Sequence, residues 1–240
     1  MLAGADRVAV ALDCGRDEAI GLADALAGHA TWAKVGMTLF YAAGPVIVSE
    51  LKDRGLKVFL DLKLHDIPHQ VRGAAEAASR TGADLLTIHA LGGPAMVRAA
   101  REGLEVAAEG RDERTRLIAV TVLTSMDEAA LEAVGVHATA EAEASLLARM
   151  ACGAGADGIV CSPREAARMR AELGSGAVIV TPGVRPAGSA TQDQSRVATP
   201  ADAIRAGSSL LVVGRPITQA ADPAAAFDAV AREASGAGRA

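Results

Sequence analysis

Aromatic residues are scarce in this sequence, with one Trp, one Tyr and three Phe among 240 residues. Proteins that bind exposed nucleic-acid bases stack them on aromatic side chains, so this composition disfavours that class of protein. The net charge is only −5, and neither a basic run nor a basic stripe is present. Nucleic acid is therefore not the expected partner, whereas a phosphorylated small molecule is compatible with the sequence.

Cysteines are also few. Cys14, Cys152 and Cys161 are an odd number of cysteines without a C-x-x-C pair, which is typical of a protein from a reducing compartment. Residues 1–7 contain no apolar signal core, and no uncharged apolar stretch reaches the length of about 18 residues that a membrane span needs. We therefore expect a cytoplasmic protein that has no membrane partner.

Several catalytic motifs are absent. The sequence has no G-x-S-x-G, P-loop or G-x-G-x-x-G motif, which disfavours hydrolases, nucleotide kinases and dinucleotide-binding enzymes. His65 and His69 are four residues apart, a spacing that can bind a metal on a helix. Pro68 lies between them and no third His or Cys has a matching spacing, so we expect no metal site. We expect His89 to be a hydrogen-bonded polar residue near the site and not a catalytic base.

Lysine is scarce compared with arginine, since the chain has twenty Arg and four Lys. Lysine differs from arginine because it is a compact charge that can give up a proton. Lys52 and Lys57 lie in a segment typical of a protein surface. Lys34 and Lys63 lie within apolar strand patterns, so we treat them as candidates for chemistry.

Short apolar runs recur along the chain, and a helix pattern follows each of them. The runs occupy 8–13, 32–36, 57–63, 85–89, 117–123, 158–161, 178–181 and 210–213. Apolar strands that alternate with helices are typical of a parallel sheet covered on both faces. Eight units over this length favour a closed (β/α)8 barrel, the TIM barrel, over an open sheet. We predict one domain over 1–240, with residues 235–240 as a frayed tail.

The strand pattern at 57–63 leads into three charged residues, Asp61, Lys63 and Asp66. Alternate side chains of a strand point to the same face, which places Asp61 and Lys63 together with their Cα atoms about 6–7 Å apart. Charges that point into a barrel at the carboxyl ends of its strands serve chemistry more often than scaffolding. The alternative is a structural ion pair at the end of a strand.

Polar residues follow most of the predicted strands. The carboxyl ends of the strands form the active-site face of such a barrel, so we expect these residues to gather around one site. They are Asp13, Lys34, Asp61, Lys63, Asp66, His89, Thr124, Ser125, Thr181, Arg185, Gly214 and Arg215.

The last two predicted strands are followed by a candidate phosphate site. The segment 183–199 is long and rich in Gly, Ser and Gln, which is typical of a lid or a disordered loop. Barrels of this type commonly hold phosphate after strands seven and eight. Arg215 offers a guanidinium fork to phosphate oxygens, and Gly214 lets a backbone N–H approach them. The alternative for Arg215 is a solvated residue at the start of a helix.

The segment Asp61–Pro68 reads D-L-K-L-H-D-I-P and resembles the D-x-K-x-x-D-I-P signature of the orotidine 5′-phosphate decarboxylase family. Family members often carry Asn-Thr after the proline, where this chain has His69 and Gln70, so the resemblance leaves open what Gln70 contacts. The similarity continues, in order, over almost the whole chain. It covers Val10–Asp13, Lys34–Gly36, Val122–Met126, Thr181–Pro186, Asp193–Gln194 and Val213–Thr218.

The resemblance implies conversion of orotidine 5′-monophosphate to UMP, the last step of de novo pyrimidine synthesis, without a cofactor or a metal. It also implies a homodimer in which Asp66 reaches the site of the partner. The implied charged network consists of Lys34, Asp61, Lys63 and Asp66. The implied substrate contacts are Asp13 and Lys34 at the ribose, Thr124 and Ser125 at the pyrimidine, Arg185, Gln194, Gly214 and Arg215 at the phosphate, and Ile67, Gln70 and Pro182 around them.

The implied reaction explains why these residue types are needed. Loss of CO2 from C6 leaves a carbanion in the plane of the ring, where the π system cannot accept the electrons. Without a cofactor as an electron sink, the site itself must stabilise the charge. The Lys63 ammonium suits this task, because it can oppose the charge and then donate the proton that replaces CO2. Arginine would be a poor proton donor.

Two other functions compete with this interpretation. Related barrels carry a similar D-x-K-x-x-D strand and use Mg²⁺ to decarboxylate or cleave sugar phosphates through an enediolate. The pyrimidine enzyme is favoured by Ile67 and Pro68, which continue the D-x-K-x-x-D strand, by the segment Leu123–Ser125, and by Gln194 with Arg215. A barrel that binds a phosphorylated ligand without turnover is the other alternative, although all four charged positions are present in this chain.

Overall fold

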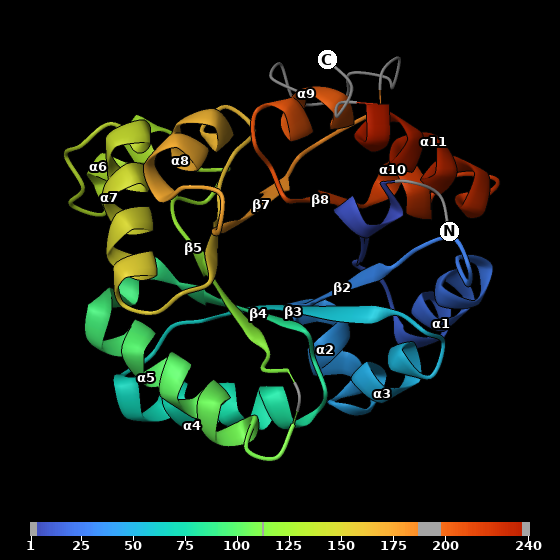
Figure 1. Ribbon diagram of the computed structural model, residues 1–240, viewed down its shortest axis with the longest axis horizontal. Coiled ribbons are helices and arrows are strands. Elements are labelled where there is room, and N and C mark those ends of the chain that lie inside the picture. The colour runs from blue at the N-terminus through green and yellow to red at the C-terminus, as the bar shows by residue number, and fades with distance from the viewer. Residues whose placement is uncertain (1–3, 112, 187–197, 237–240) are drawn as a thin grey trace.

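Eight parallel strands follow one another around a closed barrel in chain order, and β8 pairs with β1 to complete it. The computed structural model describes residues 4–111, 113–186 and 198–236. The predicted (β/α)8 barrel is therefore confirmed (Figure 1). The strands are β1 (Val8–Leu12), β2 (Trp32–Gly36), β3 (Lys57–Leu64), β4 (Leu85–His89), β5 (Arg116–Val120), β6 (Gly158–Val160), β7 (Val178–Pro182) and β8 (Leu210–Val213).

Helices form an outer layer around the strands (Figure 1). None of those in the described part of the chain combines the length and apolar character needed to span a bilayer. They are α1 (Arg16–Ala25), α2 (Met37–Ala43), α3 (Val46–Lys52), α4 (Pro68–Arg80), α5 (Gly93–Ala107), α6 (Glu128–Ala133), α7 (Ala140–Gly153), α8 (Ala166–Leu173), α9 (Pro200–Arg205), α10 (Arg215–Thr218) and α11 (Pro223–Gly236), with 3-10 turns η1 (Ala5–Arg7) and η2 (Ala90–Gly92).

The starts of several helices follow from local chemistry. Pro68 occupies the first position of α4, where its missing N–H costs no hydrogen bond. The side chains of Asp127 and Thr139 accept backbone N–H bonds at the starts of α6 and α7, which satisfies donors that a helix leaves free. The predicted frayed tail is corrected in part, because Ser235 and Gly236 belong to the last turn of α11. Residues 237–240 lie outside the described residues.

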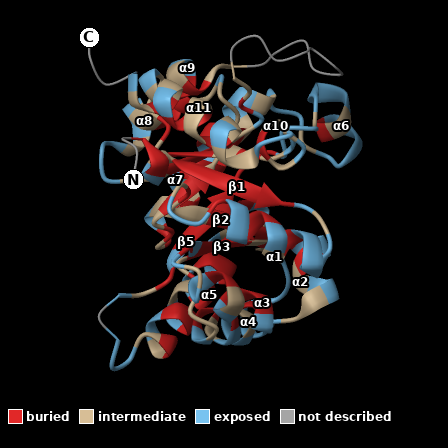
Figure 2. Cartoon of the chain, turned by 90° about the vertical axis from the view of Figure 1, so that its right-hand side faces the viewer, coloured by how far each residue is buried: buried red, intermediate tan, exposed pale blue. Residues whose placement is uncertain are grey.

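The core has two compartments. Inside the barrel, Ala9, Phe59, Leu85, Ile118 and Val180 form one buried cluster with their neighbours. A larger cluster lies between the strands and the surrounding helices. Figure 2 shows the buried residues concentrated on the strands and on the inner sides of the helices. This double burial explains why the strands are apolar on both faces.

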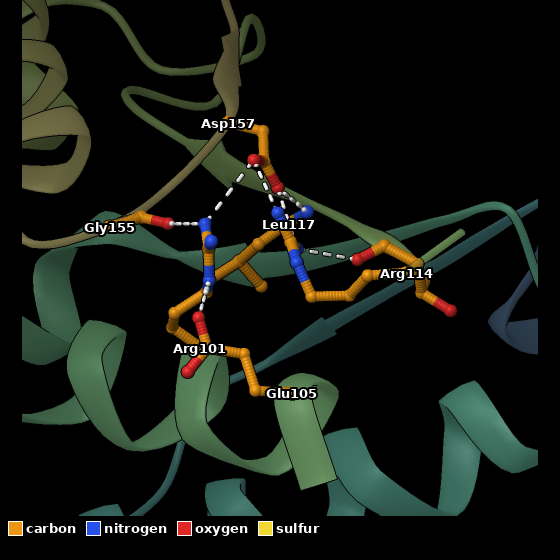
Figure 3. A network of polar contacts seen from close by, with 7 residues as sticks. Arg101, Glu105, Arg114, Leu117, Gly155 and Asp157 are labelled. Atoms are coloured by element: carbon orange, nitrogen blue, oxygen red, sulfur yellow. Dashed lines mark hydrogen bonds and ion pairs between the residues drawn. The ribbon is translucent and has the colours of Figure 1, made fainter. Parts of the chain in front are cut away.

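A polar side chain precedes every second strand at the amino-terminal rim of the barrel. Asp84, Asp157 and Ser209 come directly before β4, β6 and β8, and each accepts a backbone N–H from the strand before it in the chain. Asp157 also binds both terminal nitrogens of Arg114, at 2.6 and 2.9 Å, and Arg101 at 3.3 Å (Figure 3). These contacts fix neighbouring strands at the end of the barrel opposite the polar residues predicted above.

Candidate active site

A cavity of about 970 Å³ opens at the carboxyl ends of the strands. Phe59, from the barrel interior, is among the residues that line it. Most residues predicted for the site line this cavity, either in β2, β3 and β7 or on the segments that follow β1, β5, β7 and β8. They are Asp13, Lys34, Asp61, Lys63, Thr124, Pro182, Arg185, Gly214 and Arg215.

Four of the lining residues form a line of alternating charges. The Lys34 ammonium lies 2.9 Å from Asp13 Oδ1 and 3.7 Å from Asp61 Oδ2. Asp61 Oδ2 in turn forms an ion pair with the Lys63 ammonium at 2.8 Å. The side chains of Lys34 and Asp61 are 8 % and 15 % exposed, whereas that of Asp13 is 65 % exposed. The network is therefore covered at its centre and open at the Asp13 end.

The barrel register brings these side chains together. Residue 34 pairs with Phe59, and Gly36 pairs with Asp61 two residues further along β2 and β3. Because side chains alternate along a strand, Lys34 and Asp61 can both face the barrel interior, and Lys63 lines the same cavity. The Asp61–Lys63 pair expected from the sequence is thus present, and it lies in the cavity wall.

Gly36 is a part of this site that the sequence pattern did not identify. A Cβ atom at this position would lie 2.9 Å from Asp13 Oδ1 and 3.1 Å from the Lys34 nitrogen. Glycine therefore leaves the space in which Asp13 and Lys34 meet. In the sequence, Gly36 stood out only as the end of the second predicted strand and as part of the matching segment Lys34–Gly36. Neither of these signals reveals the close approach.

His89 lies at the end of β4, next to the charged network. Its ring is 5.4 Å from that of His65, centre to centre. Its buried Nδ1 has no hydrogen-bond partner within the described residues, so the hydrogen bond expected there is not found at this atom. Burial, and then the nearby positive charges of His65 and Lys63, lower the pKa of His89, while Asp61 opposes the shift. A neutral imidazole beside Lys63 follows at neutral pH.

Four predicted site residues, one from the charged network and three substrate contacts, do not line the cavity of this chain. Asp66, Ile67, Gln70 and Ser125 are exposed, and none of them belongs to the cavity wall. The Asp66 carboxylate accepts the Ile67 N–H at 2.6 Å. No ion pair joins Asp66 to Lys34 or Lys63 within the described chain, so a single chain brings together three of the four members of the predicted network.

The candidate phosphate site lies after β7 and β8. Gly183 has a φ of 75°, a conformation that glycine adopts without a steric cost. Beyond it, Val184 pairs with Ala198, and the Arg185 N–H donates to the Ala198 carbonyl at 3.2 Å. Arg215 is exposed on the cavity wall and has no carboxylate partner in the described part of the chain. Gln194 lies outside the described residues.

The chemistry of the side chains restricts what the site can do. Burial raises the pKa of the Cys161 thiol to about 12, and burial with nearby carboxylates raises that of Cys14 to about 11, so neither is an activated nucleophile. Among the described residues, no three His, Cys, Asp or Glu side chains are grouped as metal ligands. The Asp61 carboxylate already faces two ammonium groups, which repel a divalent cation.

Comparisons with known proteins agree on one family. Residues 6–230 match the model of the family described as orotidine 5′-phosphate decarboxylase / HUMPS. The chain is 54 % identical over 209 residues to an orotidine 5′-phosphate decarboxylase of Anaeromyxobacter sp. strain K, covering 87 % of this chain and 89 % of that protein. It is 50 % identical over 236 residues to the Halorhodospira halophila decarboxylase, covering 98 % of both.

Solved structures give the same result. The crystal structure of orotidine 5′-phosphate decarboxylase from Lactobacillus acidophilus matches with a TM-score of 0.86 and 39 % identity, over 95 % of this chain and 99 % of that chain. The similarity therefore includes the fold and most of the sequence together.

Proposed function

Because the chain belongs to the orotidine 5′-phosphate decarboxylase / HUMPS family, we propose that it converts orotidine 5′-monophosphate to UMP and CO2, the last step of pyrimidine biosynthesis. The observation that carries this proposal is the Asp61–Lys63 ion pair in the wall of a large cavity, in a chain about half identical to named decarboxylases over most of its length. A metal or organic cofactor is not part of the proposal.

Lys63 is the proposed proton donor. Breaking the bond between C6 and the carboxylate leaves an electron pair on C6, and a proton from the Lys63 ammonium then forms the new C6–H bond. Before that transfer, the positive charges of Lys63 and Lys34 stabilise the carbanion. The negative charge of Asp61 repels the departing carboxylate. The same side chain holds the Lys63 ammonium at 2.8 Å.

The remaining contacts bind parts of the substrate that do not react. Asp13 is the more exposed partner of Lys34, and this pair suits the ribose hydroxyls. Thr124 and Pro182 line the same cavity, and we assign them to the pyrimidine ring. Arg185, Gly214 and Arg215 suit the phosphate, with Gln194 as a further contact. Binding energy from a remote phosphate can help to assemble the reacting site.

We further propose a cytoplasmic homodimer in which Asp66 completes the site of the partner. The Asp66 carboxylate is exposed and lies outside the cavity wall of its own chain, which supports a role in a second copy. Large apolar side chains are exposed after three neighbouring strands: Tyr41 after β2, Ile67 after β3 and Leu91 after β4. Exposed apolar side chains at this rim are suited to burial in an interface with a second copy.

The experiment is the ultraviolet absorbance of orotidine 5′-monophosphate mixed with the purified protein in excess EDTA. The proposal predicts a rapid spectral change to UMP. The Mg²⁺-dependent sugar-phosphate enzyme predicts no change in EDTA and turnover of a sugar phosphate after Mg²⁺ is added. Binding of the nucleotide without any turnover would indicate the non-catalytic alternative.

A further inference from the structure

Strands β3 and β4 do not pair evenly. Leu60 pairs with Leu86 and Leu64 pairs with Ile88, so four residues of β3 span the distance of two residues of β4. Within this irregular part, Lys63 has a φ of 51° and is the one non-glycine residue of the described chain with a positive φ. The left-handed conformation is unfavourable for a residue with a Cβ atom. Neighbouring contacts must therefore hold Lys63 in place.

The side chain of Thr87, on β4, makes those contacts. Its Oγ1 accepts the backbone N–H of Lys63 at 2.9 Å and donates to Asp61 Oδ1 at 3.0 Å. A hydroxyl has one proton and two lone pairs, so it can make both bonds at once. Thr87 is completely buried and does not belong to the cavity wall. It can influence a bound substrate only through Asp61 and Lys63.

The two oxygens of Asp61 are consequently used for different partners. Oδ1 is held by Thr87, whereas Oδ2 lies 2.8 Å from the Lys63 ammonium and 3.7 Å from that of Lys34. The orientation of the carboxylate thus depends on the Thr87 hydroxyl. The same hydroxyl supports the backbone from which the Lys63 side chain extends.

We propose that Thr87 is the positioning residue of the charged network, fixing the Asp61 carboxylate and the strained backbone of Lys63 with one hydroxyl. Its effect on catalysis rests on the proposed decarboxylase function. Without the hydroxyl, the Lys63 N–H and Asp61 Oδ1 both lose a partner. A displacement of about 1 Å at reacting groups can cost about 100-fold in rate. The groups that bind the ribose and phosphate stay unchanged, so the loss falls on kcat and not on KM.

The test compares Thr87→Val, which keeps the shape and removes the hydroxyl, with Thr87→Ser, which restores a hydroxyl. Thr115→Val is the matched control, because Thr115 is also buried and hydrogen-bonded but contacts Ser79 and the Ala83 carbonyl. We expect Thr87→Val to lower kcat for orotidine 5′-monophosphate by about 10- to 100-fold, with KM changed by less than about threefold. Thr87→Ser should stay within about threefold of the natural protein, as should Thr115→Val.

An unchanged kcat in Thr87→Val, or a Thr87→Ser variant no better than Thr87→Val, would overturn the catalytic role. Hydrogen exchange of the Lys63 amide in the ligand-free protein provides a readout independent of turnover. This exchange should be at least about tenfold faster in Thr87→Val, because the buried donor loses its acceptor. Equal exchange in both proteins would overturn the proposed contact. If the natural protein does not turn over the nucleotide, the decarboxylase proposal fails, and the amide exchange still decides the positioning role.

Discussion

Asp61 connects both lysines of the site. Its Oδ2 lies within 3.7 Å of two ammonium groups, and its Oδ1 is bound to a buried hydroxyl. A fixed carboxylate holds the ammonium groups where negative charge develops, so little reorganisation is needed during the reaction. At the scale of single residues, the geometry of the charged groups therefore depends on the uncharged hydroxyl of Thr87.

The clearance at Gly36 leads to a prediction. The backbone of Gly36 has ordinary extended angles, φ −83° and ψ 176°, so alanine fits the main chain. Its Cβ would nevertheless lie 2.9 Å from Asp13 Oδ1 and 3.1 Å from the Lys34 nitrogen, which forces the pair apart. We expect Gly36→Ala to lower kcat/KM for orotidine 5′-monophosphate by roughly tenfold while the protein stays folded.

Gly21→Ala is the control for this prediction. Gly21 lies in α1, and nothing lies within 4 Å of the position of its missing Cβ. Alanine there should leave kcat/KM unchanged and stabilise the helix slightly. If Gly36→Ala retains full kcat/KM, the space that Gly36 leaves for Asp13 and Lys34 has no role in the site.

Sequence patterns predicted the charged residues better than the neutral ones. Asp61 and Lys63 could be placed on one face because alternation along a strand is a local property. The roles of Thr87 and Gly36 depend on atoms of other strands, which local patterns do not contain. Thr87 stood out only as a polar residue within the apolar run of β4. The position of Asp66 away from its own cavity depends on how the loop after β3 leaves the barrel.

At the scale of elements, the amino-terminal rim is stabilised by partly buried polar contacts. Asp157 joins β5, β6 and α5 through the Leu117 N–H, both terminal nitrogens of Arg114, and Arg101 (Figure 3). The side chains of Asp157 and Arg114 are 22 % and 18 % exposed. In a TIM barrel, the amino-terminal rim usually contributes stability and the carboxyl-terminal rim carries the active site.

We predict that Asp157→Ala lowers the free energy of unfolding by about 2–3 kcal/mol, because a backbone N–H and a guanidinium lose a charged partner. Urea denaturation with an unchanged slope would measure this. Glu105→Ala is the matched control, since Glu105 pairs with the same Arg101 but is 55 % exposed. Its cost should be below about 1 kcal/mol. Both variants should keep the kcat of the natural protein. Equal losses of stability in the two variants would contradict the stabilising role of Asp157.

The regular elements were largely predictable, and the short ones were not. Apolar runs identified all eight strands, and β2, β4 and β8 have the predicted bounds. The prediction for β5 extended to residue 123, whereas the strand ends at Val120. Val122 and Leu123 continue the apolar run because they line the cavity and not because they belong to the strand. Helix α2 begins directly after β2, and only Gly214 separates α10 from β8, so no loop in the sequence marks where either strand ends and the helix begins.

At the scale of the whole molecule, one chain forms an incomplete version of the proposed site. The cavity contains Lys34, Asp61 and Lys63, whereas Asp66 is exposed outside it. A symmetric dimer can supply the missing carboxylate to both sites, because each copy offers the same surface to the other. The exposed side chains of Tyr41 and Ile67, 75 % and 63 % exposed, suit such an interface.

The most direct measurement mixes two inactive variants, Lys63→Ala and Asp66→Ala, and follows the conversion of orotidine 5′-monophosphate to UMP in EDTA. Each variant alone should lose at least about 1,000-fold in kcat, since proton donation and charge stabilisation are affected. After the copies exchange, half of the dimers are hybrids with one intact site, so about a quarter of the natural activity per site should return. High activity of either variant alone, or no recovery although hybrids form, would contradict a decarboxylase site built around Lys63 and completed by a second copy.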